Sequence, residues 1–525
     1  MTRLPRPLND VIDSDIWVDE DIWGHRLYDE QTPWLTFLEF LGIVQTETTE
    51  GRGFIEKDHN TLKYNTYHRL YLRNILFNNP HLDAILAEPL DNDNQWKKWL
   101  EYIKDNCGGI DSPDFSYLAE RFSSFRDFAE AVKFLQRSSI EGDSNKRWSS
   151  KFVFPYGPHC LYEDLRVTNT GASNDRRFFA RTGELLYLMF CRAEKGQDVL
   201  YYLKKLGLVS SKEFGKFHLS KWDRLVATLQ PNLGEEKPPD RGGKRTSPYL
   251  PHSSLPEYDN LAEDWIRILQ CDMPDYDAIP HLVTITGLHI IIYLLNRAKE
   301  TLKQPTHPTF ILEVIASEKT VVRDLAATSF LENNNLSKEA VKKYIRAIEN
   351  TSAWKECETA HDPLDSAFNL LEETFAWSKP KEDAVRVSSL DKLLEDLCDR
   401  ATTRHESHLG KFHRTWSKEI GLSSSRASRR IRYAPTDSLL KTLVLCTVPY
   451  RMEFQEFLAE LYKKYGFIIG DRQAIETINT GAVDQEAFSE NAHRLEQRLI
   501  SVGLLKRLSD ACAYVQNPFA VEDFR

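Results

Sequence analysis

A segment between Arg404 and Arg432 carries the residue types best suited to binding phosphate. It holds eight lysines and arginines against only Glu406 and Glu419, in a chain of formal net charge −10. Cationic side chains neutralise phosphates, and the serines of the segment can add neutral contacts. The pattern predicts a nucleic-acid contact, with DNA as the expected ligand; a solvated basic loop and a docking surface for an acidic protein are the alternatives. The basic residues are Arg404, Lys411, Arg414, Lys418, Arg426, Arg429, Arg430 and Arg432.

Three histidines, His405, His408 and His413, lie in the same segment. His405 and His408 are one helical turn apart, but their spacing in HESH is one residue short of the H-E-x-x-H zinc motif. The nearby carboxylate of Glu406 would point away from that helix face. We therefore expect no metal ion in this segment and no cofactor in the chain.

A second basic surface is predicted around the polar run NNNLS at residues 333–337. Apolar helical patterns precede and follow this run, in the order of a helix-turn-helix. Lys338, Lys342 and Arg346 are spaced by four residues and would share one face of the second helix. The alternative is an ordinary helical hairpin whose lysines are solvated.

The segment FPYGPHCLYEDLR, residues 154–166, gathers groups that could carry catalysis. His159 with Glu163 and Asp164 could act as a general base or hold a divalent ion. No P-loop, G-x-S-x-G elbow or P-D…(D/E)-x-K nuclease pattern accompanies them. Arg181 and Glu184 follow at a spacing that also suits a helix salt bridge. We therefore favour a protein without enzymatic activity, and keep a metal-dependent nuclease or phosphodiesterase as the rival.

The remaining composition predicts a cytoplasmic protein. The eight cysteines form no C-x-x-C pair, which argues against a zinc ribbon and favours reduced thiols. The N-terminus has two prolines and acids instead of an apolar signal-peptide core. The most apolar stretch, 279–295, is short for a bilayer and is interrupted by His281 and His289, so a buried helix with core histidines is expected and no membrane span.

A length of 525 residues predicts several domains. Six of the 23 prolines fall between Pro231 and Pro256, which marks a linker or long loop because proline removes backbone donors. The predicted segments are an N-terminal helical domain (1–145), a central α(+β) domain (146–230), the proline-rich linker (231–258), a helical domain with the helix-turn-helix-like pair and the basic segment (259–445), and a C-terminal domain (446–525).

Helical periodicity dominates the chain, so the fold class is mainly α, multidomain, with minor β. Val341, Tyr344, Ile345 and Ile348 illustrate the amphipathic spacing. Strands are expected only at 151–156, at 309–316 and near the C-terminus.

The last 75 residues read as three helices followed by a hairpin, the order of a winged helix. A helix should end near Gly466, a second follow Asp471, and a third run from Asp484 to about Ser501, before strands in LLKRL and CAYV. Its basic residues are Arg494, Arg498, Lys506 and Arg507. Nucleic-acid binding and protein docking are both open for this domain.

Five stretches resemble large bacterial proteins encoded in anti-phage defence gene clusters. They are WGHRLYDEQTPWLTFLEFLGI, FPYGPHCLYEDL, RRFFARTGELLYLMF, YKKYGFIIGDRQA and NAHRLEQRLISVGLLKRLSDACAYVQNPF. The resemblance implies a component of a multi-protein defence system that acts on or senses foreign DNA, with an ATPase, helicase or nuclease among its partners. The expected function is a non-enzymatic, nucleic-acid-associated subunit or scaffold of such a complex. The alternatives are a nuclease or phosphodiesterase effector and an adaptor that binds only protein.

Overall fold

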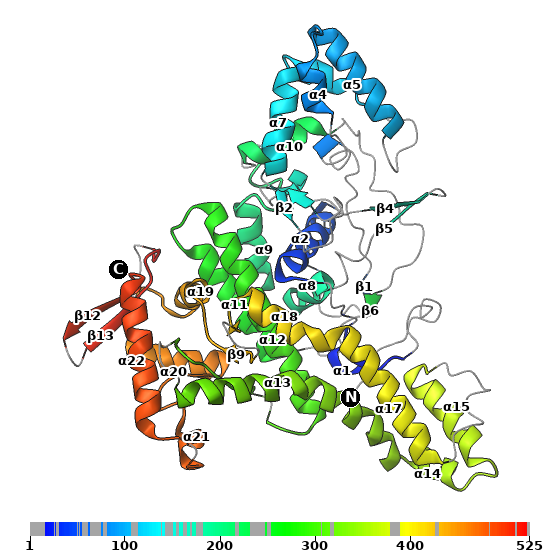
Figure 1. Ribbon diagram of the computed structural model, residues 1–525, viewed down its shortest axis with the longest axis vertical. Coiled ribbons are helices and arrows are strands. Elements are labelled where there is room, and N and C mark those ends of the chain that lie inside the picture. Colours follow the sequence, from blue (N-terminus) through cyan, green and yellow to red (C-terminus); the bar gives the residue numbers. More distant parts are fainter. Residues whose placement is uncertain are drawn as a thin grey trace. The chain divides into compact units, whose positions relative to one another are not determined.

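The computed structural model gives a mainly helical chain with a few short strands (Figure 1), as the sequence predicts. It describes residues 16–25, 27, 31–49, 51, 53–54, 61–62, 75–76, 81–106, 114–137, 139–141, 151–153, 157–160, 165–168, 171–174, 182–215, 220–230, 247–248, 254–305, 307–315, 320–377, 389–425, 430–481, 483–509 and 512–521.

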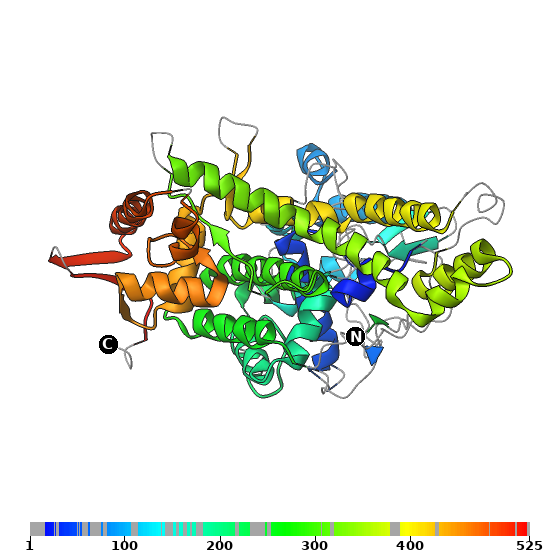
Figure 2. The same ribbon diagram turned by 90° about the horizontal axis from the view of Figure 1, so that it is seen from below.

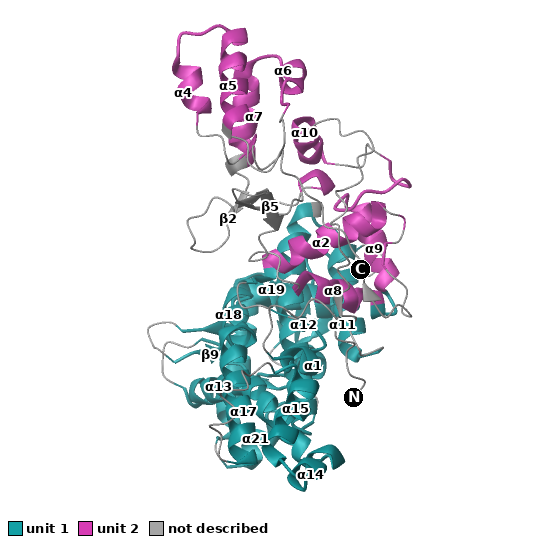
Figure 3. Ribbon diagram, turned by 90° about the vertical axis from the view of Figure 1, so that its right-hand side faces the viewer, with its two compact units in different colours: residues 1–33, 192–195, 248–525 teal, residues 34–191, 196–247 magenta. Residues whose placement is uncertain are grey.

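The chain divides into two compact units, coloured separately in Figure 3. Unit 1 comprises residues 1–33, 192–195 and 248–525, and unit 2 comprises residues 34–191 and 196–247. The five segments predicted above divide the chain more finely, and their boundaries stay a prediction. The proline-rich linker lies largely outside the described residues, and a helix already begins inside it at Pro256.

Unit 2 contains most or all of each of the following elements. They are α2 (Pro33–Thr49), β1 (Thr61–Leu62), α4 (Leu82–Ala87), α5 (Asn92–Asn106), α6 (Tyr117–Arg121), α7 (Phe125–Arg137), β2 (Ser139–Glu141), β3 (Lys151–Val153), the 3-10 turn η3 (Pro158–Cys160), β4 (Leu165–Thr168), β5 (Gly171–Asn174), α8 (Thr182–Arg192), α9 (Gly196–Lys205), α10 (Lys221–Leu229) and β6 (Ser247–Pro248). The strands pair two by two, as β1 with β6, β2 with β3 and β4 with β5.

Aromatic packing holds α5 and α7 of unit 2 together. Trp96 and Trp99 of α5 are buried against Phe128 of α7, with ring centroids 5.1 and 4.8 Å from it. Elsewhere in the unit, the Gly183 backbone N–H at the start of α8 donates to the buried Glu39 carboxylate of α2 over 2.7 Å. That bond satisfies one of the otherwise unpaired N–H groups of a helix start.

Unit 1 contains the other elements. They are α1 (Asp19–Trp23), α11 (Pro256–Gln270), η5 (Asp275–Asp277), α12 (Ala278–Thr301), β7 (Phe310–Ile311), α13 (Val321–Arg346), η6 (Ala347–Asn350), α14 (Ser352–Glu358), α15 (Pro363–Phe375), α17 (Leu390–Ser407), η7 (Leu409–Lys411), α18 (Phe412–Glu419), β8 (Ser423–Ser424), β9 (Arg432–Tyr433), α19 (Asp437–Thr447), β10 (Arg451–Glu453), α20 (Phe454–Tyr465), β11 (Phe467–Ile468), α21 (Ile475–Asn479), α22 (Gln485–Ser501), β12 (Leu505–Ser509) and β13 (Cys512–Gln516).

Helix α12 is the core helix of unit 1 and contains the apolar stretch 279–295. It is long and apolar enough to cross a bilayer, but 78% of its most apolar window is buried inside the protein, as in the central helix of a soluble protein. Two bonds fasten α1 to it: Trp23 Nε1–H donates to the Leu294 carbonyl (3.0 Å), and the Tyr293 hydroxyl donates to the Trp23 carbonyl (2.8 Å). The prediction of a buried helix is therefore confirmed.

The predicted helix-turn-helix around NNNLS is wrong, because the region forms one uninterrupted helix, α13. Asn333 is buried there, and its amide donates to the Thr309 carbonyl (3.0 Å) and to the Tyr433 hydroxyl (3.1 Å). Leu336 is buried in the next turn. The helix propensity of asparagine is less favourable than that of alanine by well under about 1 kcal/mol, so these tertiary contacts outweigh it. Figure 2 shows the unbroken helix with α17 beside it.

The predicted helices and hairpin of the C-terminal region are confirmed. Helix α20 ends at Gly466, whose φ of 73° is left-handed, and a Cβ there would collide with the Pro308 carbonyl, so the position requires glycine. Strand β13 lies between β10 and β12, and both pairings are antiparallel. The two-residue strand β11 pairs in parallel with β7, so the strand predicted at 309–316 is much shorter than expected.

A buried carboxylate cross-links three helices of unit 1. Asp264 of α11 accepts from His289 Nε2 of α12 (2.7 Å) and from the Tyr465 hydroxyl of α20 (2.7 Å), and it forms an ion pair with Lys464. Burial raises the pKa of Asp264, but the Lys464 charge and the His289 hydrogen bond outweigh this and hold the pKa below its ordinary 3.8. The prediction of a satisfied core histidine is confirmed for His289, whereas His281 is half-buried and lies 2.8 Å from Thr442 Oγ1.

Replacing Asp264 by Asn should lower the free energy of unfolding at pH 7 by about 3 kcal/mol, because Lys464 loses its buried counterion. A carboxylate with a lowered pKa stabilises the fold above its unfolded pKa, and that contribution is lost as the pH falls through the folded value. The difference between wild type and Asp264→Asn should therefore shrink below pH 3.8. Urea unfolding at several pH values measures this difference in the free energy of unfolding. Asp272→Asn, at an exposed site, is the control. If the difference between wild type and Asp264→Asn does not change with pH, the Asp264 carboxylate does not stabilise the fold in the way described.

Candidate nucleic-acid interface and a histidine–aspartate pair

Two arginines of the predicted basic segment are structural. Both terminal nitrogens of Arg404 in α17 donate hydrogen bonds to the Glu20 carboxylate of α1, at 2.6 and 3.1 Å. Arg432 of β9 is buried and bonds through Nε to Glu313, which is fully buried. Arg323 Nε of α13 donates to the other oxygen of Glu313 at 2.7 Å. Arg432 is buried and Arg404 is only 18% exposed, and both are held by buried carboxylates, so neither is available to phosphate.

Three other predicted contact residues form exposed ion pairs. Lys338 pairs with Glu406, Arg346 lies 3.3 Å from Glu349 and 3.4 Å from Asp391, and Arg430 lies 3.1 Å from Asp324. Exposed pairs of this kind contribute about 0–1 kcal/mol, so a phosphate can compete for the cations. These three residues are therefore weaker candidates for a phosphate contact, whereas Arg404 and Arg432 are excluded as phosphate contacts.

Three exposed residues of the predicted basic segment lie on the outer face of η7 and α18. We call this surface the α18 face, and its residues are Lys411, Arg414 and Lys418. Phe412 and Trp416 bury the opposite side of the helix, with stacked rings 3.9 Å apart, which turns positions 411, 414 and 418 outward. Within the described part of the chain, no carboxylate forms an ion pair with Arg414 or Lys418.

Two lysines among the exposed candidates for a phosphate contact are Lys411, on the α18 face, and Lys342, on α13. Lys411 Nζ donates to the Ser407 carbonyl over 3.2 Å. Lys342 of α13 is exposed and has no ion pair with any described carboxylate. Arg426 and Arg429 lie outside the described residues.

The histidines of the basic segment belong to the core. His405 is buried between Asp19 Oδ1 (3.1 Å) and Ser337 Oγ (2.9 Å) and stacks on Trp23. Burial lowers the pKa of His413 to about 3, so this residue stays neutral at physiological pH and adds no charge for phosphate. Among the residues that the structure describes, no three His, Cys, Asp or Glu side chains converge as metal ligands.

The arginines of the C-terminal region are also engaged within the chain. Arg494 of α22 pairs with Glu490 (2.7 Å) on the same helix, and Arg498 donates through Nε to Asp437 Oδ1 (2.6 Å) and through Nη1 to the Pro435 carbonyl (3.0 Å). Lys506 is exposed on β12. The exposed face of α22 also carries acids, so a polyanion would meet mixed charge there.

The catalytic candidate His159 of unit 2 has a partner that the sequence does not reveal. The His159 backbone N–H donates to Asp223 Oδ1 (2.7 Å), and His159 Nδ1 lies 2.6 Å from Asp223 Oδ2. Asp223 is fully buried, whereas the His159 side chain is 33% exposed. A buried carboxylate needs donors, so Nδ1 carries the hydrogen and Nε2 is left as an acceptor. Glu163 and Asp164 lie outside the described residues.

The spacing of Asp223 from Ser220 resembles an ordinary helix cap and so conceals its role as the partner of His159. Ser220 and Asp223 have the spacing of a capping box at the start of α10, and the Ser220 hydroxyl does accept from the Asp223 N–H (2.9 Å). An acid in that position is expected to turn back toward the helix start. It instead bonds to η3, where Gly157 packs so closely on Asp223 that a Cβ would overlap its carboxylate.

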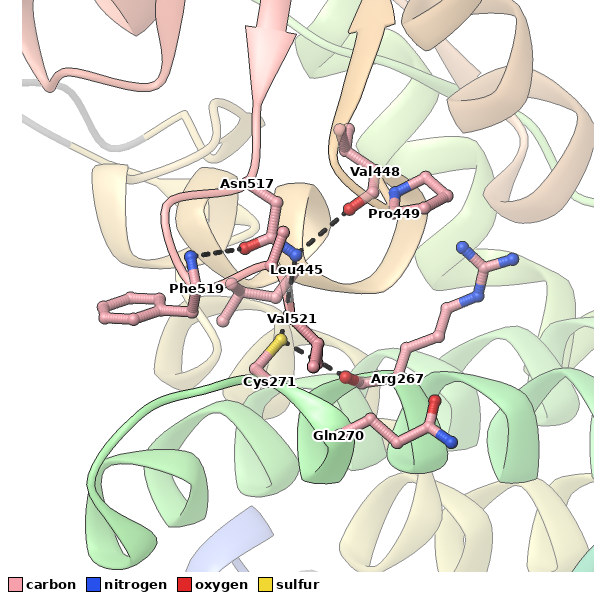
Figure 4. A pocket seen from close by; sticks show the side chains of 10 residues that line it. Arg267, Gln270, Cys271, Leu445, Val448, Pro449, Asn517, Phe519 and Val521 are labelled. Carbon is pink, nitrogen blue, oxygen red and sulfur yellow. Dashed lines mark hydrogen bonds between the residues drawn. The ribbon is translucent and has the colours of Figure 1, made fainter. Parts of the chain in front are cut away.

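A pocket of about 220 Å³ lies between α11, α19 and the chain after β13 (Figure 4). Asn517 closes it, donating to the Val448 carbonyl (3.1 Å) and accepting from the Phe519 N–H (3.0 Å). The Cys271 thiol at its wall donates to the Arg267 carbonyl, and burial raises the pKa of this thiol. A protonated thiol is a poor nucleophile, and the volume is below the range of about 300–1,000 Å³ typical of small-molecule sites.

No protein-family model, no curated protein and no solved structure matches this chain. The geometry of the two candidate sites therefore carries the functional argument.

The structural role of Arg432 can be separated from phosphate binding. Arg432→Met should lower the free energy of unfolding by about 3 kcal/mol or more, because Glu313 keeps only one of its two arginines in a buried site. Arg414→Met on the exposed α18 face should change it by less than about 0.5 kcal/mol. Chemical denaturation of both variants measures the contrast, and equal stabilities would show that the buried pair is not structural.

Proposed function

We propose that this protein is a non-enzymatic, nucleic-acid-associated scaffold or subunit of a bacterial anti-phage defence complex, which acts by binding. The observation that carries the proposal is the α18 face. Arg414 and Lys418 are exposed there and form no ion pair with a described carboxylate. On a chain of net charge −10, a local basic cluster of this kind repels a polyanion less than the net charge of the whole protein would suggest.

The C-terminal region supports a winged-helix-like arrangement. Helices α20, α21 and α22 lie between β10 and the β12–β13 hairpin, and the strand order β10-β13-β12 is the order in which the first strand and the wing of a winged helix pair. In that arrangement α22 takes the position of the recognition helix. Its Arg494 is bound to Glu490 and its Arg498 to Asp437, so its charges favour a protein partner over the DNA major groove.

Removing the α18 face should weaken DNA binding. The double variant Arg414→Ala/Lys418→Ala should bind a 20-base-pair duplex at least tenfold more weakly at low salt, and the slope of log K against log salt should fall by about 2 because two phosphate contacts are lost. Fluorescence anisotropy at several salt concentrations measures both.

The matched control for this experiment is Lys355→Ala/Lys441→Ala, which removes two exposed charges elsewhere in unit 1. The control should bind as wild type does. If both double variants lose affinity equally, binding follows net charge and not the α18 face; if neither does, the proposed interface is wrong.

The His159–Asp223 pair favours a second candidate, a phosphodiesterase or nuclease. Asp223 orients the imidazole through Nδ1, and Nε2 of the partly exposed ring can take a proton from water. A divalent ion would need further ligands beyond this pair, because the described residues supply no cluster of three. Glu163 and Asp164 are the nearest acids in the sequence.

This second candidate predicts cleavage of supercoiled plasmid in the presence of Mg²⁺ or Mn²⁺. His159→Ala should reduce the rate at least about 100-fold, as expected for loss of a general base. Asp223→Asn should lower the rate, because an amide no longer orients the imidazole as the carboxylate does. His81→Ala removes another exposed histidine of unit 2 and should have no effect. A wild-type protein that leaves the plasmid intact rules the candidate out.

A further inference from the structure

A groove that encloses about 850 Å³ runs along one side of α13 in unit 1, and we call it the α13 groove. One wall is α13 from Leu325 to Glu339, a distance of about 21 Å at 1.5 Å per residue. The facing residues include Tyr462 of α20 and Thr477 of α21. Leu325 and Ile478 of α21 both pack against an apolar cluster that includes Val322 and Phe488. No residue of the α18 face lines the groove.

Its neutral lining is rich in groups that both donate and accept hydrogen bonds. Gln304, Asn335 and Gln473 contribute amides, and threonines of α13 and α21 add hydroxyls. Gln473 Oε1 is buried and accepts no hydrogen bond in the described part of the chain. Side-chain amides can pair with both the N–H and the C=O of a polypeptide backbone. The lining therefore suits an extended peptide, and 21 Å corresponds to about six residues at 3.3 Å each.

The charge of the α13 groove favours a basic occupant. Glu332, Glu339 and Glu476 line it, and none of them forms an ion pair with a described residue. Lys299 is the one cation among the lining residues, and it too lacks an acidic partner in the described chain. Glu332 and Glu339 are seven residues apart on α13, about 10.5 Å along its axis. In an extended peptide, basic side chains four residues apart lie on one face, about 13 Å apart. These side chains are long enough to reach Glu332 and Glu339, which are about 10.5 Å apart along the helix axis.

An exposed apolar residue completes the groove. Leu331 lines it and is 58% exposed, although its neighbours Phe330 and Asn333 are buried in the same helix. Leu336, also in the lining, is nearly buried. Apolar side chains placed between acidic ones match a peptide in which aliphatic and basic residues alternate.

We propose that the α13 groove binds a short, extended, basic peptide segment of a partner protein. Backbone groups of the peptide pair with the amides of the groove, its basic side chains meet Glu332 and Glu339, and an aliphatic side chain covers Leu331. This interaction goes beyond nucleic-acid binding and does not depend on it, because the groove and the α18 face share no residue. A defect in one can therefore be measured while the other is intact.

The test uses the full-length protein and two fluorescein-labelled hexapeptide pools, one with Arg fixed at positions 2 and 6 and the other with Glu at those positions. In fluorescence anisotropy, the Arg pool should bind at least tenfold more tightly than the Glu pool. Glu332→Gln/Glu339→Gln should reduce binding of the Arg pool at least tenfold. Asn335→Trp, which fills the groove without changing its charge, should reduce it to a similar extent.

The matched control is Glu456→Gln/Glu486→Gln, which removes the same charge from exposed sites outside the groove and should change affinity less than twofold. Circular dichroism and the DNA affinity of each variant show that the fold is intact. Equal losses in both double variants, or no effect of Asn335→Trp, would reveal general attraction to an acidic protein and overturn the proposal. It would also be overturned if spermine binds in the groove and neither peptide pool does, since the site would then accept a small polyamine.

Discussion

Unit 1 depends on the burial of the Glu313 carboxylate between two arginines. Glu313 follows the short strand β7, Arg323 lies in the first turn of α13, and Arg432 lies in β9. A buried carboxylate is tolerated only when cations and hydrogen bonds compensate its lost hydration, so these three segments have to meet at one point. The Glu313 N–H also donates to the Tyr433 carbonyl (3.0 Å), which fixes the backbone of β9 beside it.

The same constraint divides the basic residues into two groups. Arg432 is drawn into the core by Glu313, and Arg404 is held at Glu20, so neither can follow a phosphate backbone. Arg414 and Lys418 lie on a helix whose other side is anchored by Trp416, through a bond from its indole N–H to the Gln31 carbonyl (2.8 Å). Burial of that apolar side forces the charges outward. The cluster that looks uniform in sequence thus combines structural arginines with a smaller exposed surface.

Local patterns predicted the elements of this fold well, because they depend on near neighbours. The helix from Phe454 to Tyr465 and its end at Gly466 follow from amphipathic spacing and from the left-handed conformation that glycine permits. The turn predicted at NNNLS was wrong because Asn333 is satisfied by Thr309 and Tyr433, partners that lie 24 and 100 residues away. Propensity carries no information about partners so distant in the sequence.

The candidate sites show the same limit. His159 was identified from its own chemistry, but Asp223 lies 64 residues away, and its spacing from Ser220 resembled an ordinary helix cap. The exposed members of the basic segment could not be told from Arg404 and Arg432 without knowing which acids are buried. The α13 groove was missed altogether, because the asparagines that suggested a turn form part of a continuous helical wall.

The proposal that unit 1 acts by binding depends on which of its polar groups are accessible. Asp264 and Tyr465 are hydrogen-bonded to each other and buried in the core, where a substrate cannot reach them. A fully hydrogen-bonded network in such a place specifies how helices pack. Among the accessible groups of unit 1 are the cations of the α18 face and the carboxylates of the α13 groove. Two surfaces of opposite charge on one rigid helical framework suit a protein that holds a polyanion and a basic polypeptide at the same time.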